Sequence, residues 1–211
     1  MLYSNMLSKI RGRRLVVSVT GASGAIYAVR FLRYAAPLCE RIDLILSSNA
    51  LAVAATELEL HLSTPIQVEE YLGGNFPSVV LQSKKDYFTP PASGSYQHDG
   101  MVIIPCSMGT VGRIAGGISD DLTTRAADVC LKERRPLIVV PRETPFNLIH
   151  LRNLTTIAEA GGTIVPAAPS FYHNPKTIED LVDTIVARVL QNLGFPQDLV
   201  PAWQSPVLQS E

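Results

Sequence analysis

The stretch RLVVSVTGASGAIYAVRFLRYAA, residues 14–36, decides the fold of this chain. Residues 14–20 are mostly apolar and β-branched, which is typical of a strand that is buried on both faces of a sheet. Small residues at 21–24 form a turn, and residues 25–36 carry apolar side chains at helical spacing. A buried strand that passes through a tight turn into an amphipathic helix is the first half of a parallel β-α-β unit.

The rest of the chain repeats this alternation of strand and helix. Five more short apolar runs predict strands at 42–46, 78–82, 101–105, 137–140 and 163–165. Helical spacing and capping residues predict helices at 49–60, 121–134, 147–160 and 177–193, and a glycine-containing helix is expected to start after the fourth strand. This alternation with short connections predicts an α/β fold with a mainly parallel sheet that helices cover on both faces.

The domain organisation is simple, because the sequence contains no internal repeat or linker. We expect one domain at 14–195, preceded by a tail at 1–13 and followed by a tail at 196–211. The first 14 residues hold four basic side chains and no acid, so they could form a solvated tail or a short mitochondrial presequence. The longest irregular stretch, 84–99, predicts a functional or mobile loop.

Composition narrows the class of function. Hydrophobic residues make up 46% of the 211 residues and charged residues 18%, so the chain can bury a core. The net charge of −1 argues against a nucleic-acid binder, and no apolar run approaches the ~18–20 residues of a membrane helix. The three cysteines and four histidines lack metal-ligand spacing, which favours a reducing compartment and argues against a metal site. We therefore expect a cytoplasmic protein, or a mitochondrial one if a presequence is present.

Two turns of small residues follow predicted strands, at the edge of the sheet where ligands of α/β proteins bind. The first, Gly21–Gly24, is neither a dinucleotide motif nor a P-loop, but the helix after it could hold a phosphate at its N-terminus. A plain tight connection is the alternative. The second, Ser107–Thr110, offers two hydroxyls and several N–H groups for an anion or the polar edge of a flat ring. Capping of a helix by Ser107 is the alternative there.

Charged residues in apolar surroundings are further candidates. Arg142 follows a buried strand directly, Arg125 and Lys132 share one face of a helix, and Arg188 lies in an apolar stretch. Arginine and lysine suit phosphate binding, although each of these could also be a solvated or salt-bridged side chain. Glu57 lies within an apolar helix and is expected to be partly buried, with a surface carboxylate as the alternative.

Over residues 14–203 the sequence resembles the UbiX family of flavin prenyltransferases. The resemblance is carried by the segments VTGASGAIYAVRFL, AATE, PPASGS, MVIIPCSMGT, RAADVCLKERRPLIVVPRETPFNLIHLRN, PAAPSFYHNP and EDLVDTIVARVLQNLG. It implies a three-layer, flavodoxin-like Rossmann sandwich. It also implies a metal-independent enzyme that joins a dimethylallyl unit from dimethylallyl monophosphate to N5 and C6 of reduced FMN. The prenylated FMN would pass to a UbiD-type decarboxylase, and the enzyme would be a homo-oligomer, usually a dodecamer.

The resemblance also implies roles for residues that match the family's motifs. The implied FMN contacts are Gly21, Ala22, Ser23, Ser47, Ser107, Met108, Gly109, Thr110 and Arg142. The implied contacts of the prenyl phosphate are Arg125, Lys132, Arg142, Glu143, Tyr172 and Arg188. The implied catalytic residues are Ser23, Glu57, Lys132 and Glu143. Ser23 and Glu57 would handle a proton during ring closure, with burial moving the pKa of Glu57 toward the working pH.

Two residues depart from the family pattern, and two other functions stay open. Tyr87 stands where relatives often have Trp, and Met108 replaces a common Thr. Tyr87 and Trp203 are candidate walls for a pocket that shelters an allylic cation, although Trp203 could equally anchor the C-terminal tail. The other functions are a direct flavin-dependent decarboxylase and a non-catalytic flavin carrier. The cationic residues favour the prenyltransferase, because a helix N-terminus alone could meet the single phosphate of FMN.

Overall fold

The computed structural model describes residues 12–201, which form a six-stranded sheet in the order β3-β2-β1-β4-β5-β6. The strands are β1 (Arg14–Val19), β2 (Arg41–Leu46), β3 (Val79–Gln82), β4 (Met101–Cys106), β5 (Leu137–Pro141) and β6 (Thr163–Ile164). Every pair of neighbours is parallel, so the predicted α/β fold and the six predicted strands are confirmed. The sheet is doubly wound. Strands β2 and β3 are added on one side of β1, and strands β4 to β6 on the other, so the order of the strands reverses between β1 and β4.

The helices occupy the connections between strands. They are α2 (Ala25–Ala35), α3 (Ser48–Glu57), α4 (Val68–Leu72), α5 (Met108–Ala115), α6 (Leu122–Lys132), α7 (Leu148–Glu159) and α8 (Ile178–Asn192), with 3-10 turns η1 (Ala36–Leu38) and η2 (Pro90–Ala92). The helix expected at 49–60 ends earlier, because Glu59 has a left-handed φ of 52° that a continuing helix cannot include. Helix α4 was not expected, since five residues are too few to show helical periodicity.

Side-chain caps explain where most of these helices begin. In five of them an oxygen of the N-cap side chain accepts a hydrogen bond from the backbone N–H three residues later, which satisfies a group that the helix leaves free. These caps are Ser47, Ser107, Asp121, Asn147 and Thr177. Helix α2, which lies at the site, has no such cap, because its N-cap residue Gly24 has no side chain that could accept a hydrogen bond.

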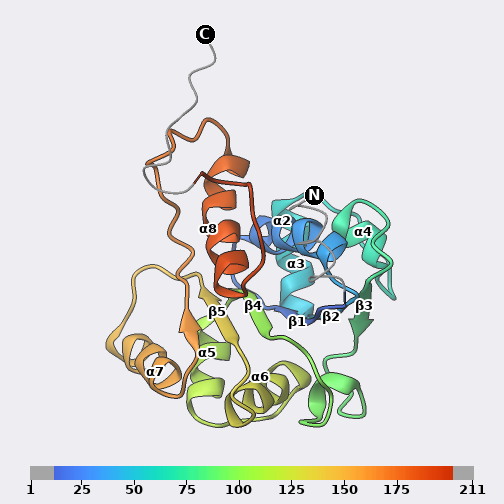
Figure 1. Cartoon of the computed structure of the whole chain (residues 1–211), viewed down its shortest axis with the longest axis vertical. Helices are drawn as coiled ribbons and strands as arrows, with labels where there is room; N and C mark the ends of the chain where they lie inside the picture. Colours follow the sequence, from blue (N-terminus) through green and yellow to red (C-terminus); the bar gives the residue numbers. More distant parts are fainter. Residues whose placement is uncertain (1–11, 202–211) are drawn as a thin grey trace, which may run out of the picture.

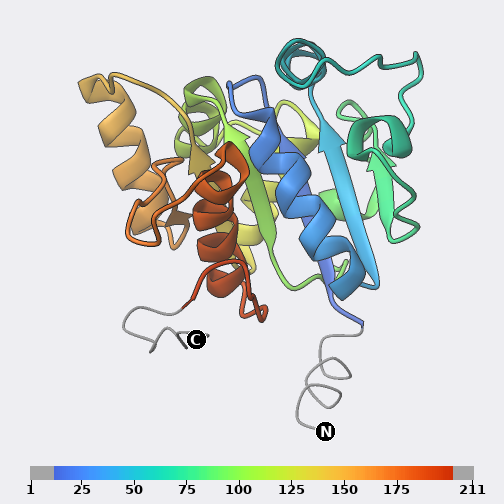
Figure 2. The ribbon, with the colours of Figure 1, turned by 90° about the horizontal axis from the view of Figure 1, so that it is seen from above.

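The sheet lies between two layers of helices. Helices α2, α3 and α8 cover one face, and α5, α6 and α7 cover the other (Figure 1). Figure 2 shows α2 and α8 side by side on the first face. Neighbouring residues of β1 point to opposite layers: Val17 packs in the core with α2 and α8, and Val16 packs in the core with α5 and α6. Both faces of the sheet are therefore apolar, as a parallel sheet requires.

The long loop at 84–99 is held against the domain by hydrogen bonds. The hydroxyl of Tyr96 donates to the buried carboxylate of Asp43 over 2.8 Å. Arg135 donates to the carbonyl groups of Gly94 and Tyr96, each over 2.6 Å. These contacts hold the loop against β2 and the segment before β5.

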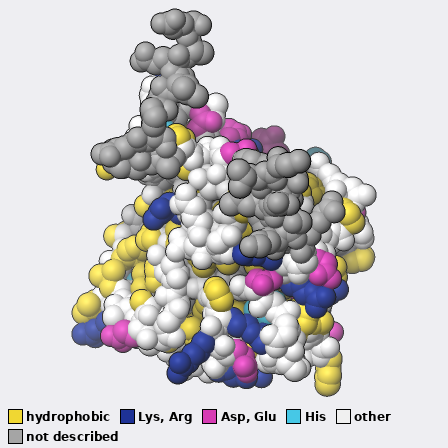
Figure 3. All heavy atoms as spheres, viewed as in Figure 1, with side chains coloured by type: hydrophobic (Ala, Val, Ile, Leu, Met, Phe, Trp, Pro, Cys, Tyr) yellow, Lys and Arg dark blue, Asp and Glu magenta, His cyan; other side chains and the backbone are white. Residues whose placement is uncertain are grey.

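Helix α7 has an unusually apolar outer face. It buries Ile157, while Leu148, Ile149 and Leu151 are 60%, 65% and 48% exposed. Figure 3 shows hydrophobic side chains gathered on the side of the molecule where Figure 1 places α7.

Three further findings concern the described part of the chain alone. No helix within residues 12–201 is long and apolar enough to span a bilayer. No group of three or more His, Cys, Asp and Glu side chains in this part could hold a metal ion. The three cysteines lie within it and are free and buried.

Candidate active site

The candidate site lies at the carboxyl ends of β1 and β4, where ligands of doubly wound sheets bind. Thr20 joins the turns that follow these strands. Its N–H and its hydroxyl both donate to the carbonyl of Pro105, over 3.2 and 3.0 Å, and its Oγ1 accepts from the N–H of Ser107 over 2.7 Å. Sequence analysis missed this residue. A hydroxyl at the end of an otherwise apolar strand was the available signal.

The turn after β1 is packed tightly by the chain itself. A Cβ atom at Gly21 would lie 2.4 Å from Cβ of Asn49, so only glycine allows α3 to approach this closely. Gly24 has a φ of 105°, which L side chains rarely adopt. Ala22 is buried, and its N–H donates to the carbonyl of Thr20 over 2.9 Å.

Glu57 caps helix α2 from outside the helix. Its carboxylate accepts from the N–H of Gly24 over 3.1 and 2.8 Å, and from the N–H of Ala25 over 2.8 Å. We had expected the start of this helix to offer free N–H groups to a phosphate. That expectation is wrong for these two groups, because the end of α3 supplies an anion from within the chain.

Glu57 is largely exposed, which is the surface alternative given above, and its pKa differs from the expected one. The limited loss of solvent around its carboxylate raises the pKa of Glu57. Hydrogen bonds from the Ser23 side chain and from the N–H groups of Ala25 and Gly24, together with the charge of Arg142, outweigh that effect and lower the pKa below its ordinary value. The expected rise toward neutral pH is therefore corrected. At neutral pH Glu57 is a carboxylate, which can accept a proton but does not hold one.

Arg142 completes this group of charged and polar residues. It follows β5, and its Nε donates to the carbonyl of Ser23 over 3.1 Å. The structure thus brings together Ser23, Glu57 and Arg142, which the sequence placed far apart. A base, a hydroxyl and a fixed positive charge meet beside the turn after β1.

The turn after β4 consists of Ser107 and the first residues of α5, Met108–Thr110, and it is more open. Ser107 caps α5, and its Oγ lies 3.4 Å from the N–H of Thr110 and 3.2 Å from Oγ1 of Thr110. Met108 and Thr110 are buried, whereas Gly109 is exposed, and a Cβ atom placed on it would meet nothing within 4 Å. A flat ligand can therefore approach the backbone at Gly109 and the side chain of Ser107. The side chains of Met108 and Thr110 face inward.

Ser47 lies at the same edge of the sheet, after β2, but its oxygen is already used. Its Oγ accepts from the N–H of Ala50 over 3.0 Å and so caps α3. The hydroxyl proton of Ser47 is its remaining contribution to a ligand.

The cationic residues expected around the prenyl phosphate do not meet within one protomer. Lys132 is the last residue of α6, before β5, and Arg142 comes directly after β5. The five residues of this strand span about 16 Å, so the two residues lie at opposite edges of the sheet. Lys132 pairs with Glu133 and lies against the loop at Gly94. Arg125 donates to the carbonyl of Ala92 in that loop over 3.0 Å.

Arg188 and Tyr172 lie together, apart from Lys132. Arg188 is on α8, which covers the other face of the sheet from α6. Both residues line a cavity of about 340 Å³ together with Ser170 and Thr184. Glu143 follows Arg142 but is exposed, and its Oε1 accepts from the N–H of Thr144 over 3.0 Å.

Of the two expected aromatic walls, Tyr87 lies within the described residues. The hydroxyl of Tyr87 lies 3.4 Å from the carbonyl of Ser119, and the side chain is half exposed on the loop before η2. Trp203 lies outside the described residues.

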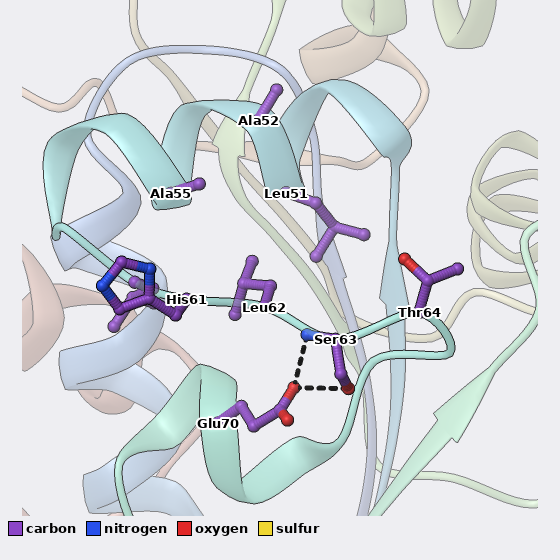
Figure 4. A pocket seen from close by; sticks show the side chains of 9 residues that line it. Leu51, Ala52, Ala55, His61, Leu62, Ser63, Thr64 and Glu70 are labelled. Carbon is purple, nitrogen blue, oxygen red and sulfur yellow. Dashed lines mark hydrogen bonds between the residues drawn. The ribbon is translucent and has the colours of Figure 1, made fainter.

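Another cavity, of about 670 Å³, lies between α3, the segment 60–64 and α4 (Figure 4). Its charged group is the carboxylate of Glu70, which accepts from the N–H and the hydroxyl of Ser63 over 2.9 and 2.8 Å. No residue predicted for the site lines this cavity. It is separate from the group at the ends of β1 and β4.

This chain is similar to known proteins in both sequence and structure. The Flavoprotein family model matches residues 3–190. The flavin prenyltransferase UbiX of Pseudomonas aeruginosa is 44% identical over 203 residues, which cover 94% of this chain and 97% of the relative. The flavin prenyltransferase UbiX of Synechocystis is 45% identical over 201 residues, which cover 90% and 95%.

Two solved structures are similar over nearly the whole chain. The crystal structure of AnUbiX (PadA1) in complex with FMN and dimethylallyl pyrophosphate has a TM-score of 0.83 and 37% identity, covering 92% of this chain and 99% of that one. The dodecameric, FMN-dependent UbiX-like decarboxylase from Escherichia coli O157:H7 has a TM-score of 0.80 and 36% identity, covering 91% and 100%.

Proposed function

This chain belongs to the UbiX family of flavin prenyltransferases, and from that premise we propose how its own residues transfer a prenyl group to FMN. The donor is dimethylallyl monophosphate, and the acceptor is reduced FMN, which supplies the N5 and C6 atoms that take the dimethylallyl unit. The observation that carries the proposal is the meeting of Ser23, Glu57 and Arg142 beside an open turn at Gly109.

FMN binds across the two turns at the switch point of the sheet. Its contacts are Gly21–Ser23, Ser47, Ser107–Thr110 and Arg142. The open space over Gly109 supports this assignment, because a side chain there would fill the room that a flat ring system needs. The side chains of Met108 and Thr110 are buried, so these two residues contact FMN through their backbone atoms.

The prenyl donor loses phosphate when its carbon–oxygen bond breaks and a bond to N5 forms. The electron pair of the broken bond leaves with the phosphate, so the site has to stabilise negative charge there. Arg142, Lys132 and Arg188 supply positive charge, Tyr172 a hydroxyl, and Arg125 supports Lys132 from the same helix. Glu143 orients the donor beside Arg142. In this proposal side chains, rather than a metal, neutralise the leaving phosphate.

For the second bond, the carbon–carbon double bond of the N5-linked dimethylallyl unit takes up one proton, which balances the proton that N5 gives up in the first step, and its other carbon forms the bond to C6. C6 then releases its own proton. The Glu57 carboxylate is ionised at neutral pH because Ser23 and two backbone N–H groups stabilise its charge. It can therefore accept this proton directly or through the Ser23 hydroxyl. The lowered pKa keeps Glu57 ionised at neutral pH, so Glu57 is available to accept a proton and has none to donate.

A homo-oligomer explains why the phosphate-binding residues are dispersed. Lys132 lies at the opposite end of β5 from Arg142 and on the opposite face of the sheet from Arg188, so a phosphate site that includes all three needs residues from more than one copy. The apolar outer face of α7 supports association, since large exposed apolar patches are typical of interfaces. We take a dodecamer, the assembly of the E. coli relative, as the assembly of this chain.

The product serves a further enzyme, because the modified flavin leaves this site as a cofactor. Its recipient in this proposal is a UbiD-type decarboxylase. The free, buried cysteines fit a reducing compartment such as the cytoplasm.

The test is to incubate the purified protein with reduced FMN and dimethylallyl monophosphate, without oxygen, and to weigh the released flavin by mass spectrometry. We expect a flavin heavier by one dimethylallyl unit and free phosphate in equal amount. Unchanged flavin with loss of CO₂ from a small acid would indicate a decarboxylase instead, and unchanged flavin alone would indicate a carrier.

Arg188→Ala tests the proposed donor site separately from the flavin site. Loss of a charge-assisted hydrogen bond costs about 1.5–3 kcal/mol, so the affinity for the donor should fall by about 10- to 100-fold. FMN should still bind to this variant. Equal loss of both ligands would contradict the separation of the donor site from the flavin site.

A further inference from the structure

Arg113, near the end of α5, links the start of α6 to the open turn after β4. Its Nη1 donates to Oδ1 of Asp120 over 2.8 Å and to Oδ2 of Asp121 over 2.6 Å. On its other side, Nη2 donates to Oγ1 of Thr110 over 3.2 Å, and Nε lies 3.4 Å from the carbonyl of Gly109. The guanidinium group therefore contacts both Gly109 and Thr110 of this turn.

These contacts fix the direction of the hydrogen bond between Thr110 and Ser107. An arginine side chain can only donate hydrogen bonds, so Oγ1 of Thr110 accepts from Arg113. The Thr110 hydroxyl therefore has to donate its own hydrogen bond to another acceptor. Thr110 is 2% exposed, and within residues 12–201 its hydroxyl has one other oxygen in reach, Oγ of Ser107 at 3.2 Å. The reverse direction would leave the buried Thr110 proton without an acceptor, which is costly.

Ser107 is the member of this chain of contacts that can reach a ligand. Its Oγ accepts from the hydroxyl of Thr110 and, over 3.4 Å, from the N–H of Thr110. Both acceptor positions of the oxygen are then in use. Its own proton has to point away from Thr110. Ser107 is partly exposed, and the space at Gly109, two residues later, is open.

We propose that Arg113 is a positioning residue of the flavin site, which acts through Thr110 to turn the Ser107 hydroxyl outward as a hydrogen-bond donor to FMN. This inference rests on the proposed placement of FMN at the turn after β4. It assigns a role to the buried side chain of Thr110, whose hydroxyl orients Ser107 while any contact of Thr110 with the ligand is made by its backbone.

The acidic partners hold Arg113 in the orientation that this role needs. Asp121 is the N-cap of α6, and it also pairs with Lys84 over 2.9 Å. If Arg113 is removed, Lys84 and the N–H of Thr124 still satisfy Asp121. Arg113→Leu is therefore expected to fold, and Thr110→Val tests the same chain of contacts without disturbing the ion pairs.

The test is a double-mutant cycle on the affinity of the whole protein for FMN, measured by the quenching of flavin fluorescence. A neutral hydrogen bond corresponds to an affinity change of about 3- to 10-fold. We expect Arg113→Leu, Thr110→Val and Ser107→Ala each to weaken FMN binding by that factor. Thr110→Ser, which keeps the hydroxyl, should bind as the wild type does.

The decisive result is non-additivity. In a Ser107→Ala background, Arg113→Leu and Thr110→Val should weaken binding no further, because the donor that they orient is already gone. If both act with full effect in that background, Arg113 has a structural role only and this inference is overturned, while the flavin contact of Ser107 stands. If Ser107→Ala alone leaves FMN affinity unchanged, the placement of FMN at this turn is overturned, and the inference with it.

Discussion

The turn after β1 and the turn after β4 each join a buried strand to a helix through small residues, and they lie next to each other at one edge of the sheet. In the first, Asn49 packs against Gly21 and the Glu57 carboxylate covers the N–H groups at the start of α2. In the second, Ser107 caps α5 locally, and the space above Gly109 is open. The chain itself occupies the space beside Gly21 and covers the first N–H groups of α2, whereas the space above Gly109 is open.

This difference divides the tasks at the site. The filled turn fixes an anion, a hydroxyl and, through Arg142, a positive charge, which suits proton transfer and phosphate binding. The open turn presents backbone and one outward hydroxyl, which suits a flat ligand. Two glycines of similar appearance in the sequence therefore matter for different reasons: Gly21 for internal packing and Gly109 for access.

The largest effect is expected on the chemical step at the filled turn. Glu57→Gln keeps the shape of the side chain and removes the base, so FMN and donor should bind and the bond to N5 should form. Closure of the fourth ring should slow by about 10²–10⁴-fold. The check is the flavin product: its mass should show one added dimethylallyl unit, while its absorption spectrum should be that of the unclosed form.

Either of two other results would change this assignment. Normal ring closure by Glu57→Gln would limit Glu57 to capping α2. Failure to form any adduct would place Glu57 in the first bond-forming step instead.

The next effect concerns packing. Gly21→Ala places a methyl group where Cβ of Asn49 lies 2.4 Å away, so α3 or the turn has to shift. Such overpacking typically costs about 1–3 kcal/mol, which lowers the melting temperature by about 2–4 °C for each kcal/mol in a protein of this size. Thermal unfolding without ligand measures this. An unchanged melting temperature would show that the first turn is not closed in the way described.

The smallest effect is the pH dependence of the cap on α2. The pKa of Glu57 is lowered in the folded protein, so its stabilising effect is complete above the ordinary glutamate pKa of about 4.3 and is lost as the pH falls through the folded-state pKa. The wild type should be more stable than Glu57→Gln by less than about 1 kcal/mol at neutral pH. Denaturant unfolding over a pH series should show this difference shrinking in acid. A difference that grows in acid would contradict the lowered pKa.

The sequence predicted the strands well because buried parallel strands are continuous apolar runs, such as MVIIPC before Ser107. It also predicted that Gly21, Ser107 and Arg142 would lie at one edge, since the carboxyl ends of parallel strands meet there. The start of α8 was readable from the capping box of Thr177 and Asp180. The cap of α6 is Asp121, one residue after the predicted cap Asp120.

What the sequence did not predict depends on contacts between distant segments. The capping of α2 by Glu57 requires the end of α3 to reach the turn after β1, and no local pattern reports this. The same contacts lowered the pKa of Glu57 when burial alone suggested a rise. The sequence did predict a strand between Lys132 and Arg142, but the resemblance assigned both residues to one phosphate. Within one protomer they lie at opposite ends of β5.

The most direct test of the contrast between the two turns is Gly109→Ala, measured both for thermal unfolding and for FMN affinity. The added methyl group meets no protein atom within 4 Å, and alanine is the better helix former, so the unliganded variant should be as stable as the wild type or slightly more stable. FMN affinity should nevertheless fall by about tenfold or more, because the methyl group occupies the space of the ligand. Full affinity for FMN with unchanged stability would show that the flavin does not approach this turn and would contradict the account.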